Sequence, residues 1–147
     1  MNSIVISAFS LLVAFAAFIV AYLAYRRDRG DLRVTLTYHP ETELGTSFQV
    51  RTVNHGRRTV EVETVSLLLE SGKSITYSEI CESTTLPRLL PKTLEENDYE
   101  EFSFPLYAFE DHIHSPLEVI QAEVHDTLGR TYKVRSSHRL KRQISEH

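Results

Sequence analysis

Residues 4–25 read IVISAFSLLVAFAAFIVAYLAY and contain no charged residue, no proline and no glycine. As an α-helix, these roughly 22 residues would extend about 33 Å at about 1.5 Å per residue. The hydrocarbon core of a bilayer is about 30 Å thick. All Asp, Glu, Lys and Arg residues follow this stretch. The sequence therefore predicts one transmembrane helix followed by a polar domain outside the bilayer.

The apolar stretch is predicted to be a retained anchor and not a cleaved signal peptide. Only Met1, Asn2 and Ser3 precede it, and none of these side chains is charged. A secretory signal has a basic segment before a shorter apolar run. Tyr22 and Tyr25, near its C-terminal end, suit the headgroup interface of a bilayer.

Arginines directly after the anchor predict its orientation. Arg26, Arg27 and Arg29 follow the span, whereas no basic side chain precedes it. Positive charge is retained on the cytoplasmic side of a membrane. We therefore expect a single-pass protein of the inner or plasma membrane, with its N-terminus outside and its domain in the cytosol. The same arginines, with Arg33 and the basic segment 130–142, also suggest an alternative role in binding anionic lipid.

Small residues recur along the anchor at alternating spacings of three and four. This stripe consists of Ser7, Ser10, Ala14, Ala17, Ala21 and Ala24. Small side chains allow transmembrane helices to approach closely, which is a main source of their attraction in lipid. The stripe therefore predicts self-association through the anchor, although alanine and serine are also common in anchors that do not associate.

About 122 residues follow the anchor, which is enough for one domain with its own core. We expect a charged linker at 26–31, a β domain at 32–135 and a basic tail at 136–147. The net charge of −4 argues against general nucleic-acid binding, which needs a cationic face. Cys81 is the only cysteine, so no internal disulfide is expected, as suits a reducing compartment.

Alternation of apolar and polar residues predicts strands through most of the domain. It is clear at 32–38 and 48–52, and the apolar parity changes between Val62 and Val65, which predicts a bulge. Another short strand is expected at 74–80. The segment 126–130 predicts a hairpin turn with Gly129 in the left-handed region. Thr93 and Glu96 have the spacing of a helix capping box. The expected fold is an all-β antiparallel sandwich of seven strands.

Several turn and strand motifs resemble those of immunoglobulin-like and fibronectin-III-like sandwiches. They are Phe48-x-Val50, Asn54-x-Gly56, Val60-x-Val62 and Asp126-x-x-Gly129-Arg130-x-Tyr132. The layout of the whole chain is similar to that of small single-pass bacterial and phage membrane proteins. The resemblance implies an immunoglobulin-like strand arrangement but assigns no functional residue. The chain departs from true immunoglobulin domains because it has no Trp and no second Cys.

No established catalytic motif occurs in the sequence, so we predict no catalytic, cofactor-binding or metal-binding residues and no enzyme activity. Two alternatives remain open. His112 and His114 would suit a transition metal, and the turn 54–58, with Arg57 and Arg58, would suit a phosphate or an acidic partner. We expect a membrane-tethered interaction module whose partners are the bilayer, through residues 4–25, and an unidentified protein. An exported ligand-binding domain is the further alternative.

Overall fold

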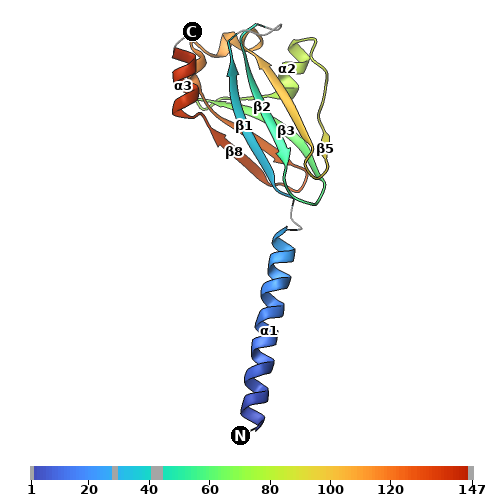
Figure 1. Ribbon diagram of the computed structural model, residues 1–147. Helices are drawn as coiled ribbons and strands as arrows, with labels where there is room; N and C mark the ends of the chain where they lie inside the picture. Colours follow the sequence, from blue (N-terminus) through green and yellow to red (C-terminus); the bar gives the residue numbers. More distant parts are fainter. Residues whose placement is uncertain (1, 28–29, 41–44, 146–147) are drawn as a thin grey trace.

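The computed structural model describes residues 2–27, 30–40 and 45–145, and begins with one long helix, α1 (Asn2–Arg27). Within this part of the chain the strands are β1 (Leu32–His39), β2 (Ser47–Asn54), β3 (Val60–Leu69), β4 (Ser74–Thr76), β5 (Lys92–Leu94), β6 (Tyr99–Pro105), β7 (Val119–Asp126) and β8 (Thr131–Arg135). The shorter helices are α2 (Tyr77–Ser83), α3 (His138–Ser145) and the 3₁₀ turns η1 (Leu106–Ala108), η2 (Glu110–His112) and η3 (Pro116–Glu118). Figure 1 shows α1 projecting away from the β domain.

Two antiparallel sheets form the domain. One has three strands in the order β1-β2-β6, and the other has five, with the path β4-β3-β7-β8. β4 pairs with the second half of β3 and β5 with its first half. The prediction of an antiparallel β domain after an apolar helix is confirmed. The number of strands was wrong, since the described residues form eight and not seven.

The core lies between the two sheets, where alternate residues of the longer strands are buried, as in β2 and β7. Phe48, Phe102 and Phe104 are fully buried in the three-stranded sheet and pack in the same apolar core as Val65 and Leu67 of β3. Burying a side chain of this size contributes about 1.5–3 kcal/mol. The sandwich therefore has a core of its own, to which α1 contributes no buried residue among those described.

A β-bulge in β3 confirms the change of parity seen in the sequence. Val62 pairs with Asp126, whereas Thr64 pairs with the preceding residue of β7, His125. One extra residue, Glu63, therefore lies in β3 at this point. The bulge lets residues on both sides of it, including Val62 and Val65, face the core.

Helix α2 replaces the second half of the strand predicted at 74–80. The Thr76 side chain accepts a hydrogen bond from the Glu79 backbone, and the Glu79 carboxylate accepts one from the Thr76 backbone. This capping box starts a helix in place of a continued strand. The hydrogen bond from Thr76 also lowers the pKa of Glu79. Cys81, the single cysteine of the chain, is buried on this helix.

The C-terminal segment is part of the domain. Residues 136–147 were predicted to be a basic tail, either helical or disordered; α3 forms within them, and its Ile144 is buried in the core. Figure 1 shows α3 beside the sandwich, at the end away from α1. The apolar core thus includes a residue of this segment.

Candidate functional site

The described side chains of α1 are exposed along their whole length. The segment Ser7–Tyr25 is long and apolar enough to cross a membrane, and none of it is buried. The stripe Ser7, Ser10, Ala14, Ala17, Ala21 and Ala24 lies within this segment. Spacings of three and four residues place its members along one face of the helix. Its role in association stays a prediction.

The arginines of the predicted topology signal are only partly described. Arg29 and the side chains of Arg26 and Arg27 lie outside the described residues, whereas Arg33 is exposed on β1. The second basic segment, 130–142, begins beside the start of the domain and ends in α3. Figure 1 shows α3 at the end of the domain opposite α1. The two segments are thus not gathered at one end of the domain.

The backbone just before β1 is held to the five-stranded sheet by an arginine. The Nη1 atom of Arg130, from the turn between β7 and β8, donates to the carbonyl oxygen of Gly30 at 3.2 Å. Gly30 is buried, and a Cβ at this position would overlap the Cγ2 of Val60. A glycine is therefore needed where the chain enters the sandwich. We call Gly30, Asp126, Arg130 and Tyr132 the entry clamp.

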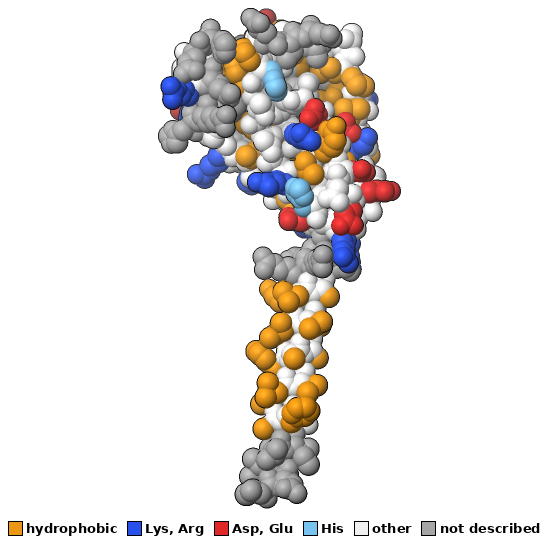
Figure 2. Space-filling view, in the orientation of Figure 1, with side chains coloured by type: hydrophobic (Ala, Val, Ile, Leu, Met, Phe, Trp, Pro, Cys, Tyr) orange, Lys and Arg blue, Asp and Glu red, His pale blue; other side chains and the backbone are white. Residues whose placement is uncertain are grey.

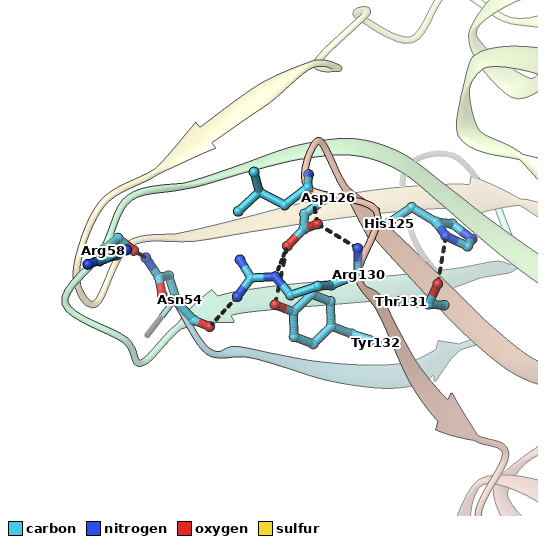
Figure 3. A network of polar contacts seen from close by, with 9 residues as sticks. Asn54, Arg58, His125, Asp126, Arg130, Thr131 and Tyr132 are labelled. Atoms are coloured by element: carbon cyan, nitrogen blue, oxygen red, sulfur yellow. Dashed lines mark hydrogen bonds and ion pairs between the residues drawn. The ribbon is translucent and has the colours of Figure 1, made fainter. Parts of the chain in front are cut away.

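Asp126 holds the arginine of the entry clamp in place (Figure 3). Its side chain is 1% exposed, and its Oδ2 accepts from Arg130 Nε at 2.7 Å and from Tyr132 Oη at 3.3 Å. Its Oδ1 accepts from the backbone N–H groups of Leu128 and Arg130. Burial alone would raise the pKa of Asp126, but the hydrogen bonds and charge of Arg130 outweigh it, so this pKa lies below its usual range.

Asn54 organises the turn between β2 and β3 at the same end of the domain. Its Nδ2 donates to the carbonyls of Arg58 and Leu94, and its Oδ1 accepts from the N–H of Gly56. The side chain is fully buried. Its polar atoms are occupied by the protein backbone, which favours the turn interpretation of 54–58 over a phosphate site.

A chain of polar contacts crosses the outer face of the three-stranded sheet. His39 Nε2 donates to Gln49 Oε1 at 3.0 Å, and Gln49 Nε2 donates to Glu101 Oε2 at 2.9 Å. Glu101 lies 3.7 Å from Arg51 Nε, and the Arg51 guanidinium lies 4.4 Å from the centre of the Tyr99 ring. We call these five residues the outer-face ribbon. None of them was predicted as a site residue.

The outer face of the five-stranded sheet has a different composition. Glu123 on β7 accepts from Lys133 on β8 at 2.8 Å and lies 3.6 Å from His125. The hydrogen bond from Lys133 lowers the pKa of Glu123. On the face drawn in Figure 2, which has β1 and β2 in front, basic, acidic and histidine side chains are scattered over the domain, whereas the helix presents apolar side chains.

His112 and His114, the alternative metal site, are both exposed near η2. His112 lines a shallow hollow of about 200 Å³ together with Lys73 and Glu79. Among the described residues, no group of three His, Cys, Asp or Glu side chains is placed to hold a metal ion. The hollow therefore offers a mixed-charge surface and no ligand set.

In sequence comparisons, no protein-family model matches the chain, and no curated protein matches it. The function is therefore argued from the geometry of α1, the entry clamp and the two outer sheet faces.

Proposed function

We propose that the chain is a non-enzymatic interaction module, tethered to a membrane by α1 and presenting its β sandwich at the cytosolic face. The observation that carries the proposal is the exposure of α1. Its apolar side chains from residue 7 to residue 25 are all exposed, although the sandwich has a core of its own. An apolar surface of this size has to be shielded from water. A bilayer matches the length and composition of this helix.

The outer-face ribbon is the surface that we propose for the protein partner. Its exposed members Arg51 and Tyr99 belong to the residue types that are enriched in protein interfaces. The other outer face is centred on Lys133 and Glu123, which are types depleted from interfaces. Tethering raises the effective concentration of the module at the membrane, so that weak binding becomes sufficient.

Site-specific photocrosslinking in native membranes tests this surface. A photoreactive residue at Thr35, which lies on β1 beside Arg51, should give an adduct with a discrete protein, because Thr35 is exposed on the same face. The matched control is Thr131, an exposed threonine on β8 of the other sheet. The adduct should weaken when Arg51→Ala is added. Equal adducts from both positions, or none from Thr35, would contradict the assignment of the surface.

The orientation follows from Arg26, Arg27 and Arg29 by the positive-inside rule. A reporter fused after His147 should therefore be active only in the cytosol. Activity of a periplasmic-type reporter at that position would instead favour the exported ligand-binding alternative. Self-association through the small-residue stripe, and a relationship to immunoglobulin-like proteins, are further parts of the proposal.

Binding of anionic lipid through the basic segments is the second candidate function. It is favoured by the arginines at the start of the domain, including the exposed Arg33. It receives less support from α3, because that helix lies at the end of the domain away from α1 (Figure 1). Binding to phosphatidylserine vesicles that is released by salt would support it.

A further inference from the structure

Among the described residues outside α1, Leu128 is the most exposed large apolar side chain, with 75% of its surface accessible. It lies at the tip of the turn between β7 and β8. The turn is well defined, because the N–H of Leu128 donates to Asp126 Oδ1, the N–H of Gly129 donates to the Asp126 carbonyl, and Gly129 has φ +76°. The leucine is thus held outward by the same carboxylate that secures the entry clamp.

The turn that bears Leu128 is fixed close to the end of the anchor. Arg130, two residues after Leu128, binds the carbonyl oxygen of Gly30. Helix α1 ends at Arg27, so only residues 28 and 29 lie between the helix and Gly30. Consecutive Cα atoms are about 3.8 Å apart, so the Cα atoms of Arg27 and Gly30 are separated by about 11 Å at most. Figure 1 shows the start of β8 at the end of the domain from which the chain passes to α1.

Tyr99 lies at the same end of the domain and is the next most exposed large apolar or aromatic residue outside α1, at 56%. It starts β6 directly after Asp98, whose carbonyl accepts from the N–H of Asn54 in the neighbouring turn. Tyrosine is a residue type favoured at the headgroup level of a bilayer. The two most exposed apolar side chains of the described domain are therefore both on the anchor side.

The charges around these residues are of both signs. Arg57 and Arg58 are exposed in the turn after β2, and Glu95 and Glu96 are exposed in the turn after β5. Attraction to anionic lipid through the arginines is offset by repulsion of the carboxylates. An attachment at this end would therefore depend on apolar burial and respond weakly to salt.

We infer that the turn between β7 and β8 is a second membrane contact, in which Leu128 enters the interfacial layer of the same bilayer that α1 spans. This inference rests on the proposed anchoring by α1. The interfacial layer is about 5–7 Å thick on each side of the hydrocarbon core. An exposed side chain at the tip of a turn on the anchor side of the domain could enter such a layer without any change in the sandwich.

The chain contains no tryptophan, so a single introduced tryptophan reports its own depth in the bilayer. The full chain is reconstituted in vesicles whose lipids carry bromine either near the headgroup or deep in the acyl chain. Three variants are compared. Leu128→Trp tests the contact, Tyr107→Trp is a control that is 51% exposed on η1, and Phe18→Trp marks the span.

We expect shallow bromine to quench Leu128→Trp, deep bromine to quench Phe18→Trp, and neither to quench Tyr107→Trp. Quenching of Leu128→Trp should persist in high salt. If Phe18→Trp is quenched and Leu128→Trp behaves like Tyr107→Trp, the membrane contact is refuted while the anchoring stands. If high salt abolishes the quenching of Leu128→Trp, insertion of Leu128 into the bilayer is refuted. Absence of quenching in Phe18→Trp would refute the anchoring and this inference with it.

Discussion

Replacement of Asp126 by alanine tests the entry clamp. The change removes a carboxylate that is 1% exposed and accepts hydrogen bonds from Arg130, Leu128 and Tyr132. Loss of one partner of a buried ion pair costs about 3–5 kcal/mol. The side chain of Arg130 is 32% exposed, so its charge regains some hydration in the variant. We therefore expect the free energy of unfolding to fall by about 3 kcal/mol, at the lower end of that range.

The assay is urea unfolding of the full chain in detergent micelles, followed by circular dichroism of the β sandwich. Glu101→Ala is the control, because the pair that it forms with Arg51 is exposed on the outer sheet face and should contribute at most about 1 kcal/mol. Equal destabilisation by the two variants would refute the reasoning, since it would mean that burial of the Asp126 carboxylate adds nothing.

The pH dependence of stability gives a second measurement on the same carboxylate. The pKa of Asp126 is lowered in the folded protein, so its stabilising effect is present above the unfolded pKa of about 3.9 and is lost as the pH falls through the folded pKa. Asp126→Asn should therefore flatten the decline in stability on acidification below about pH 4. An unchanged acid profile would indicate that Asp126 does not carry this dependence.

Three further changes test other parts of the molecule. Ala17→Leu should weaken self-association of the anchor in a membrane two-hybrid assay, whereas Phe15→Leu, which lies off the small-residue stripe, should not. Equal signals from the two variants would show that the stripe reflects amino-acid composition and does not mediate association. Thr52→Val should stabilise the domain by about 1 kcal/mol, as measured by urea unfolding, because the Thr52 hydroxyl is buried and has no hydrogen-bond partner in the described structure. A destabilised variant would show that the hydroxyl has a hydrogen-bond partner. A fragment of residues 30–147 should fold without α1. It should melt at a higher temperature than a fragment of residues 30–135, which lacks α3 and its buried isoleucine, worth about 2 kcal/mol. Equal melting temperatures would show that α3 adds no stability.

Features that depend on local sequence were predictable. The apolar run that forms α1, the bulge between Val62 and Val65, and the turn with Gly129 at positive φ all follow from residues close together in the chain. Each has a sequence signal of its own: length and apolarity, a change of parity, and a glycine where a side chain would be strained.

Helix α2 shows why the spacing of a capping box alone was not sufficient to predict a helix. Thr76 with Glu79 and Thr93 with Glu96 have the same spacing, yet only the first pair starts a helix, and Thr93 lies in β5. After Thr76, the apolar residues Tyr77, Ile80 and Cys81 recur at helical spacing and are buried. Only Leu94 follows Thr93 before a run of polar residues. A capped start becomes a helix where an apolar face is available to bury.

The outer-face ribbon and the entry clamp could not be predicted, because they depend on contacts between distant parts of the chain. Gln49 meets Glu101 only in the register that pairs β2 with β6, and a shift of β6 by one residue would put the two side chains on opposite faces of the sheet. Arg130 meets the carbonyl of Gly30 across 100 positions of sequence. No local pattern specifies either contact.

The entry clamp and the short connection to α1 together constrain how a partner would reach the outer-face ribbon. Gly30 is held by Arg130, and only two residues separate it from the end of α1. β1 starts next to Gly30 and runs to the opposite end of the domain, and β2 and β6 pair along it in one sheet. In the proposed topology this end of β1 lies at the bilayer, so that the ribbon extends from Tyr99, on the anchor side, to His39, at the far end of the sheet. A partner in the same membrane meets this surface by lateral diffusion, with the concentration gain of tethering on both sides. A soluble partner has that gain on one side only, so the proposed tethering would favour a membrane-bound partner over a soluble one of equal affinity.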